Sequence, residues 1–478
     1  MKSIYVITTV VITLLQCVIQ NSKAASPWLN PENPSVRSDI TLLSDAGIIK
    51  TPITTWPLNW SNIKRDLFAS RKGSYTPIVA AARSRLLKIC NRETAKGVSN
   101  HYSFAISPAG VMPSFFSSES LRSDSLKTSY SRSWLGNQTA YDLSINAVYT
   151  GDNLYKLRFD GTYVAGIIDN WSVSLGYFDR WWGPGWKNSP IMSTNARPFP
   201  AISIRRNYSD KSENILMSWM GCWHFESVFG RIDRTETSHL LFWGRRYNIK
   251  PFEQLELSFS RTSVWGGDES EDLNSFMDVV EGAPDESSDV GQLAAFDFRL
   301  GLYLYTQKPL AIYGQYVAKN TGLYSFDNSD NIGMIGFEYT PVLSNNILSL
   351  RLFAEFESMS GFNIYDFAPS LTGYSNKGRL IGIDRADIVR SITLGGIAAS
   401  SSQGNNYLIN LTYLEASDIA GDSVGDGYEI AFDYSFKNWG GKIKAGMAYK
   451  DYPPSQEKEN KNEDKFCFRL IWEDDFKR

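Results

Sequence analysis

Residues 296–305 read Phe-Asp-Phe-Arg-Leu-Gly-Leu-Tyr-Leu-Tyr, an alternation of apolar and polar side chains that recurs along most of this chain. Side chains alternate between the two faces of an extended strand, so the pattern places Phe296 and Phe298 on an apolar face and Asp297 and Arg299 on a polar one. Ten residues are also about the length that a tilted strand needs to cross a bilayer. The stretch therefore predicts a strand over 296–305 with lipid on one side and water or protein on the other.

The same period of two recurs after residue 102, in stretches separated by turn-forming residues. A large soluble β-protein shows the same alternation, but three features favour a membrane barrel. The apolar face persists through strand after strand, the N-terminus resembles an export signal, and an amphipathic stretch lies near the C-terminus. Clear examples of the alternation are 141–149, 171–177, 348–356, 407–413, 428–436, 443–449 and 466–472.

The composition excludes a helical membrane protein. The 478 residues are 42% hydrophobic and 14% aromatic, yet the mean hydropathy is −0.27. Each spanning helix needs about 20 apolar residues in a row, whereas half of each barrel strand is polar. The net charge of −3 gives no reason to expect nucleic acid as a partner.

The first 24 residues have the pattern of a secretory signal peptide. Met1-Lys2 supplies a basic tip, an apolar run follows over 4–19, and Ser22-Lys23-Ala24-Ala25 ends in small residues. We expect cleavage after Ala24; an N-terminal membrane anchor is the alternative. Export with a barrel pattern predicts the cell outer membrane as the location.

Residues 25–100 are expected to form a helical plug domain, and residues 101–478 the barrel. The barrel length corresponds to about 16 to 18 strands, a width that leaves a lumen unless something fills it. We expect the helical unit to pack inside the barrel or against its periplasmic mouth. The three expected helices run from a cap at Ser38-Asp39 to Gly47, from a cap at Asn59 or Ser61 past Leu67, and from Pro77 to Ile89.

The sharpest local motif is the tryptophan-rich turn at 180–186. Indole rings stack on the C–H faces of pyranose sugars, and arginine can bind carboxylated sugars. The alternative is structural, with a tight Gly-Pro-Gly turn and tryptophans that anchor at the membrane interface or fill the barrel wall. The residues predicted to contact saccharide are Arg180, Trp181, Trp182, Trp186 and Arg197.

No catalytic or metal site is predicted, and no cofactor. Removal of the signal leaves Cys90, Cys222 and Cys467, which form neither a disulfide framework nor a zinc spacing. Residues 266–290 hold nine carboxylates and no Lys or Arg, but lack EF-hand spacing, so an outward solvated loop is favoured over a divalent-cation site. The mixed-charge stretch 451–465 is a second expected outward loop.

A series of short segments is spread along the chain in a specific order. They are Leu43-Ser44-Asp45-x-Gly47-Ile48, Thr55-Trp56-Pro57-Leu58, Trp181-Trp182-Gly183-Pro184-Gly185, Arg197-Pro198, Trp265-Gly266-Gly267, Gln292-Leu293-Ala294-x-Phe296-Asp297-Phe298, and Tyr374 with Gly378-Arg379 and Ile381-Gly382. In this order they resemble the capsule-assembly Wzi family of outer-membrane proteins. The resemblance implies a barrel of roughly 18 strands closed by an N-terminal helical plug. It also implies a non-catalytic, lectin-like role in organising exported capsular polysaccharide.

The expected function is therefore binding and anchoring of capsular or extracellular polysaccharide at the cell surface, without catalysis. The expected partners are this polymer and outer-membrane lipid, with the protein as a monomer. Two alternatives remain open at this point. One is a porin-like channel for saccharides or other solutes, which requires an open lumen. The other is an outer-membrane hydrolase, which requires a nucleophile or carboxylate beside a base.

Overall fold

The structure is a computed structural model, and it describes the greater part of the chain. The predicted signal peptide (1–24), all but the first residue of the predicted acidic loop (267–290) and 454–464 of the mixed-charge loop lie outside the described residues. The described residues are 26–70, 75–109, 111–117, 124–150, 154–233, 240–266, 291–320, 326–343, 348–361, 364–365, 373–400, 404–417, 423–453 and 465–474.

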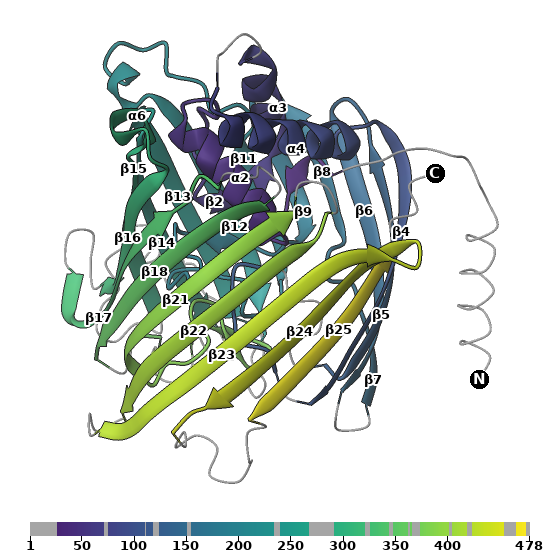
Figure 1. The fold of residues 1–478 in the computed structure, drawn as a ribbon, viewed down its shortest axis with the longest axis vertical. Helices are drawn as coiled ribbons and strands as arrows, with labels where there is room; N and C mark the ends of the chain where they lie inside the picture. The colour runs from purple at the N-terminus through teal and green to yellow at the C-terminus, as the bar shows by residue number, and fades with distance from the viewer. Residues whose placement is uncertain are drawn as a thin grey trace.

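Antiparallel strands dominate the fold and close into a barrel (Figure 1). Its strands are β4 (Gly97–Ala109), β5 (Leu126–Leu135), β6 (Thr139–Thr150), β7 (Leu154–Arg158), β8 (Tyr163–Ile168), β9 (Trp171–Tyr177), β11 (Pro200–Arg206), β12 (Cys222–Ile232), β13 (Leu240–Phe252), β14 (Leu255–Gly266), β15 (Gly291–Gly301), β16 (Leu310–Asn320), β17 (Phe326–Tyr339), β18 (Leu348–Ser360), β21 (Ile388–Ser400), β22 (Asn406–Ser417), β23 (Ser423–Asn438), β24 (Gly441–Asp451) and β25 (Phe466–Asp474).

Within the described residues these are nineteen strand segments that make eighteen strands. Both β7 and β8 pair along β6, so they are two halves of one strand. The ring closes where β25 pairs with β4. The predicted all-β barrel of 16 to 18 strands is confirmed. In the described part of the chain, no helix has the length and apolar character needed to cross a membrane.

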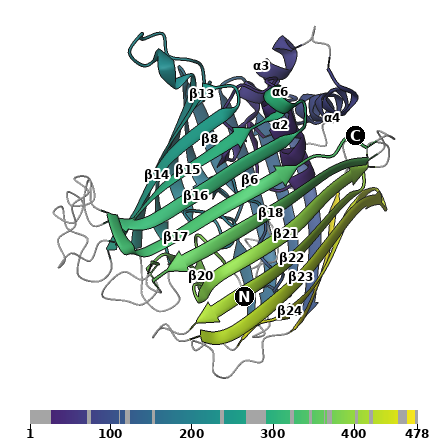
Figure 2. The same ribbon diagram turned by 60° about the vertical axis from the view of Figure 1, so that its left-hand side comes forward.

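The barrel has two distinct rims. We call the rim where β4 begins and β25 ends the helix end, because the N-terminal helices lie there, and the opposite rim the loop end (Figures 1 and 2). Two-residue turns at 169–170, 253–254 and 439–440 join strands at the helix end. Longer connections, including 178–199 and 361–387, leave from the loop end.

The alternation around Phe296 has the predicted orientation on β15. Phe296 is 50% exposed on the outer face, whereas Asp297 is 1% exposed on the inner face. The strand begins and ends earlier than predicted, since it spans Gly291–Gly301 and α6 (Tyr303–Thr306) follows. The chain must turn back into β16 here, and Tyr303 is buried with its hydroxyl 2.9 Å from Thr76 Oγ1 of the helical region. Tyr303 and Leu304 pack against the apolar side chains of the plug, which explains why apolar residues continue past the end of the strand.

Aromatic pairs surround the outer face near both rims, as in outer-membrane barrels. Such rings lie at the two membrane–water interfaces. Near the helix end the pairs are Trp134–Tyr141, Trp171–Phe225, Phe225–Tyr247 and Tyr407–Tyr434. Near the loop end they are Tyr149–Tyr155, Tyr413–Tyr428 and Tyr449–Phe466.

Three helices of the N-terminal region occupy the helix end (Figure 1). They are α2 (Pro34–Asp45), α3 (Trp60–Ala69) and α4 (Pro77–Glu93), with short strands β1 (Trp28–Leu29), β2 (Thr55–Trp56) and β3 (Leu58–Asn59) beside them. The predicted starts at Asn59 and Pro77 are confirmed.

The predicted start of α2 at Ser38-Asp39 is wrong. The helix begins at Pro34 after the N-cap Asn33, whose side chain accepts a 3.1 Å hydrogen bond from Ser35 N. Ser38 and Asp39 lie buried inside the helix, where arginine side chains satisfy them. The Ser38 hydroxyl accepts from Arg351 Nε (2.8 Å), and Asp39 accepts from Arg85 at 2.6 and 2.9 Å. Ser38 and Asp39, which belong to residue types that often cap helices, therefore make tertiary contacts with arginines instead.

Candidate functional site

The lumen is filled from both ends. We call residues 178–199, between the seven-residue strands β9 and β11, the lumen segment. It turns inward from the loop end and contains β10 (Trp181–Trp182), which pairs antiparallel with β2 of the plug. Gly183 N also donates to Thr54 O at 3.0 Å. A segment entering from one rim thus forms a small sheet with a segment entering from the other.

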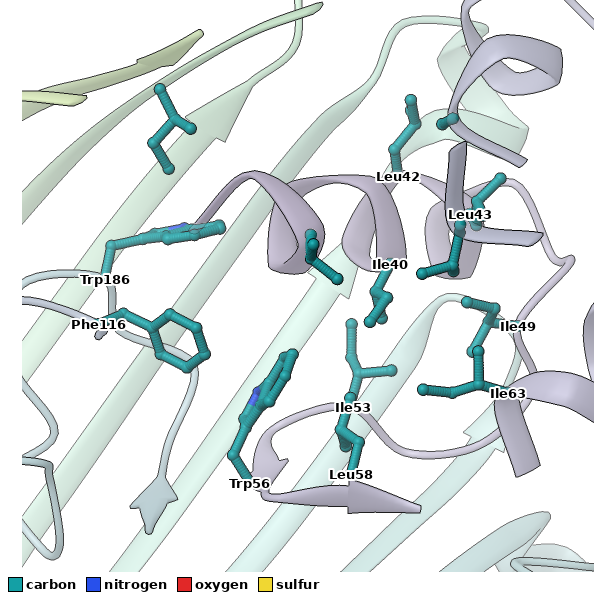
Figure 3. Close-up of a cluster of buried hydrophobic side chains, with 14 of the residues drawn as sticks. Ile40, Leu42, Leu43, Ile49, Ile53, Trp56, Leu58, Ile63, Phe116 and Trp186 are labelled. Atoms are coloured by element: carbon teal, nitrogen blue, oxygen red, sulfur yellow. The ribbon is translucent and has the colours of Figure 1, made fainter. Parts of the chain in front are cut away.

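Arg37 of α2 connects the plug to the tryptophan-rich turn. Its guanidinium donates to Gly185 O (2.8 Å) and Pro184 O (2.5 Å), and its central carbon lies 4.1 Å from the Trp186 ring and 4.2 Å from Phe116. Burial lowers the pKa of Arg37 to about 9, which still leaves the side chain charged at neutral pH. Figure 3 shows Phe116 between Trp186 and Trp56, on the side of α2 that carries Ile40.

Carboxylates on the inner face of the wall bind the same turn. Glu355 of β18 accepts from Trp186 N (2.5 Å) and Lys187 N (2.9 Å), and Glu338 of β17 accepts from Trp186 Nε1 (2.8 Å). Lys187 Nζ donates to Glu429 at 2.7 Å. Burial would lower the pKa of Lys187, but Glu429 and Asp384 outweigh it and raise that pKa. The turn is therefore fixed by charged groups that are themselves out of water.

Two glycines of the turn lie too close to neighbouring atoms to carry a side chain. A Cβ on Gly185 would collide with Asn188 O and lie 2.9 Å from Met334 Cε. A Cβ on Gly183 would lie 2.8 Å from both Gln315 Nε2 and Ser189 Oγ, and its φ of +157° is one that side chains rarely adopt. The Gly-Pro-Gly sequence is thus explained by packing inside the barrel.

The structure buries all three predicted tryptophans. Trp181, Trp182 and Trp186 are 0%, 0% and 1% exposed. Trp181 and Trp186 share an apolar cluster with Trp56 and Phe116, whereas Trp182, on the opposite face of β10, joins a second cluster. Burial favours the structural alternative, but the rings pack in the lumen beside the plug, not at the membrane interface or in the wall where that alternative placed them. Saccharide contact by these rings stays a prediction.

The two predicted arginines are placed apart. Arg180 is buried beside the wall, where it donates to Ser203 Oγ (2.7 Å) and lies 3.6 Å from Glu226. Burial lowers its pKa to about 10, although Glu226 opposes that shift. Arg197 makes a two-point ion pair with Asp160, at 3.0 and 2.8 Å. Both arginines thus pair with barrel carboxylates.

Buried ion pairs fasten the plug to the wall. Arg299 donates to both oxygens of Asp45 at the end of α2, at 2.6 and 2.8 Å, and also to Glu338. Arg351 binds Glu338 (2.9 Å) and donates to Ser38 O (2.9 Å). The prediction that the polar face of β15 meets water or the plug is confirmed for Arg299. Arg351 was not singled out from the sequence, although its inward position on β18 was the available signal.

Two further wall residues bind the loop before β2 and the first residue of β2. Glu256 accepts from Ile53 N (2.8 Å) and Thr54 N (3.0 Å). Arg246, which pairs with Asp297 at 2.7 and 2.9 Å, donates to Thr55 Oγ1 at 2.7 Å. Among the residues that the structure describes, no three His, Cys, Asp or Glu side chains are grouped to hold a metal ion.

Comparison with known proteins gives concordant results. A family model described as "Capsule assembly protein Wzi" matches residues 117–390. A relative from Klebsiella pneumoniae, described as an uncharacterized 55.8 kDa protein in the cps region, is 28% identical over 334 residues. That match covers 66% of this chain and 63% of the relative, so less than two thirds of the relative is spanned.

The fold is also that of a solved structure from Escherichia coli. It is described as Wzi, an outer membrane protein involved in group 1 capsule assembly and a carbohydrate-binding β-barrel. The TM-score is 0.76 at 19% identity, and the match covers 94% of this chain and 99% of that one. At this identity the likeness establishes a shared fold.

Proposed function

Because the chain belongs to the capsule assembly protein Wzi family, we propose that it binds and organises capsular polysaccharide without cleaving it. It is an outer-membrane β-barrel, with an apolar outer face between two aromatic girdles. Barrels of this class have short turns on the periplasmic side. The helix end, with its two-residue turns, therefore faces the periplasm in this proposal, and the loop end faces outward.

The closure of the lumen from both ends supports a polymer-binding role over a channel. The plug and the lumen segment meet at β2 and β10, and Trp56, Trp181 and Trp186 fill the space there with at most 1% exposure. Charged wall residues, above all Arg299, hold the plug in place. A solute path through this part of the barrel requires breaking buried ion pairs.

The use of the lumen carboxylates supports a non-catalytic role. Glu338 and Glu355 accept hydrogen bonds from the plug or the lumen segment, and Glu256 from the backbone of 53–54. Catalytic carboxylates must instead face a substrate and exchange protons with it. These acids stabilise the closed interior, and we assign them no reaction.

The role of the tryptophan-rich turn follows from its burial. A saccharide reaches these rings only if the lumen segment leaves the barrel, because the rings are covered on all sides in the closed state. We propose that the turn supports polymer binding by anchoring the lumen segment beneath the loop end. Direct saccharide contact remains the second possibility for Arg180, Trp181, Trp182, Trp186 and Arg197.

Equilibrium binding to purified capsular polysaccharide tests the proposal. Protein in lipid nanodiscs is titrated with acidic capsular polysaccharide, with neutral dextran as the control polymer. Saturable binding with an unchanged polymer size distribution is expected. Absence of binding, or shortening of the polymer, contradicts the proposal.

Variants of the turn separate the two roles. Trp186→Ala is compared with Trp439→Ala, which alters an exposed ring at a helix-end turn. An anchoring role predicts that Trp186→Ala lowers barrel stability together with binding. Loss of binding with unchanged stability supports direct stacking on the sugar.

A further inference from the structure

A groove of about 360 Å³ opens at the helix end, between α3 and the rim of the barrel wall. One side is formed by the first half of α3 and by residues 26–28. The other side is formed by the helix-end portions of β5, β6, β8 and β9, by the turn between β5 and β6, and by Asn207 and Tyr208 directly after β11. None of the residues that line this groove takes part in the lumen contacts described above, so the groove is separate from that site.

The lining of the groove combines aromatic rings with hydroxyl and amide groups. Tyr208, at 37% exposed, stands at its edge, and Trp28 and Trp60 form its floor. Sugar-binding sites use this combination, because rings take the C–H faces of a pyranose and amides bond its hydroxyls. The hydroxyl and amide side chains are Ser26, Ser61, Thr94, Asn137, Gln138, Thr139, Ser172 and Asn207.

The charged side chains that line the groove are all positive. Lys64 and Arg65 line the groove, and none of its lining residues is an aspartate or glutamate, although the chain as a whole carries net charge −3. Arg65 already pairs with Asp66 and Asp210, and its guanidinium lies 5.3 Å from the Tyr208 ring centroid. Lys64 Nζ donates to the neutral Thr94 hydroxyl at 3.0 Å, and within the described residues no carboxylate pairs with it.

We propose that this groove binds an acidic sugar unit, with the sugar carboxylate on Lys64 and the sugar ring against Tyr208. Asn137 and Gln138 are placed to bond its hydroxyls, since both are exposed amides that line the groove. The Asn137 side-chain oxygen already accepts from Lys96 Nζ, which leaves its amide N–H groups for the sugar. The inference rests on the proposed function and adds a second binding place, on the periplasmic side, with a stated ligand class. A neutral sugar leaves the cation unused, and an apolar peptide leaves the amides and hydroxyls unpaired.

Titration with a short uronic-acid oligosaccharide tests this assignment. Protein in nanodiscs, where both rims are accessible, is titrated by calorimetry with a tetramer of glucuronate and with a neutral glucose tetramer. Lys64→Gln removes the charge and Tyr208→Ala removes the ring. Each is expected to weaken glucuronate binding about tenfold, the effect of losing one charge-assisted contact or one ring contact. Binding should also weaken with added salt.

Matched controls lie on the same rim. Lys308→Gln and Tyr305→Ala alter exposed side chains in and beside α6, outside the groove, and should leave the affinity unchanged. Equal binding by Lys64→Gln, Tyr208→Ala and the unchanged protein overturns the groove assignment. If the unchanged protein still binds whole capsular polysaccharide in that case, the proposed function stands without the groove. Absence of binding to both polymer and tetramer overturns both.

Discussion

Arg37 joins two parts of the chain that approach from opposite rims. Its charge is compensated at a distance by Glu338 and Glu355, and its hydrogen bonds go to two carbonyls of the turn. A buried cation of this kind is costly alone and favourable only when its partners are present. Removing the side chain leaves the carbonyls of Pro184 and Gly185 without this hydrogen-bond donor. It also removes the positive charge near Glu338 and Glu355.

Arg37→Ala is therefore expected to lower the free energy of unfolding by about 3 kcal/mol, the cost of breaking a buried charged contact. Urea denaturation in detergent micelles, followed by tryptophan fluorescence, measures the change. Arg390→Ala is the matched control, because Arg390 is exposed and 3.9 Å from Glu415; its loss should cost less than about 1 kcal/mol. Equal stability of the two variants contradicts the assigned role of Arg37.

Gly185→Ala tests the packing of the turn with a single methyl group. The added Cβ would collide with Asn188 O, so we expect a loss of about 2 kcal/mol, as for overpacked cores. Gly333→Ala is the control, since among the described residues, its two chain neighbours aside, no atom lies within 4 Å of its Cβ position. That variant should stay within about 1 kcal/mol of the unchanged protein. Thermal unfolding of both, in the same detergent, gives the comparison.

At the scale of elements, the strands were predictable and the interior was not. The period of two located β15 and gave the correct outer face for Phe296, because one face of each strand meets lipid. The same rule failed past Gly301, where apolar side chains pack on the plug instead. The cap signal at Ser38 failed for a related reason, since its partner Arg351 lies 313 residues away.

The position of the lumen segment was even harder to predict from local sequence pattern. The sequence indicated a tight tryptophan-rich turn and left open whether it binds sugar, anchors at the membrane interface or fills the barrel wall. The residues that decide its place, Glu338 and Glu355, lie 152 and 169 residues from Trp186. Local pattern carries no information about such pairings, and a long connection at the loop end can fold outward or inward. Only the three-dimensional arrangement distinguishes them.

The link between α2 and β15 is testable as an element-scale coupling. Asp45 and Arg299 form a two-point ion pair across the plug–wall boundary. A double-mutant cycle with Asp45→Asn and Arg299→Gln should give a coupling free energy of about 2 kcal/mol, typical of buried contacting charges. Arg390 and Glu415 serve as the exposed reference pair, with a coupling below about 1 kcal/mol. If the stability losses of Asp45→Asn and Arg299→Gln are additive, the ion pair does not hold the plug to the wall, and this account is contradicted.

At the scale of the molecule, the barrel is a membrane-embedded wall around a packed interior. The outer face is built for lipid by its apolar strands and two aromatic girdles. The inner face is built for protein, because its arginines and glutamates bind the plug and the lumen segment. An eighteen-stranded wall wide enough for a pore is thereby used as a closed scaffold.

Conductance of the full-length protein in planar lipid bilayers tests this closed-scaffold claim most directly. A general porin recorded in the same bilayers supplies the positive control. We predict that the unchanged protein inserts and stays electrically silent across the voltage range in which the porin conducts, since the plug and the lumen segment meet at β2 and β10. Steady ohmic conductance of porin magnitude from the unchanged protein contradicts the account and favours a channel.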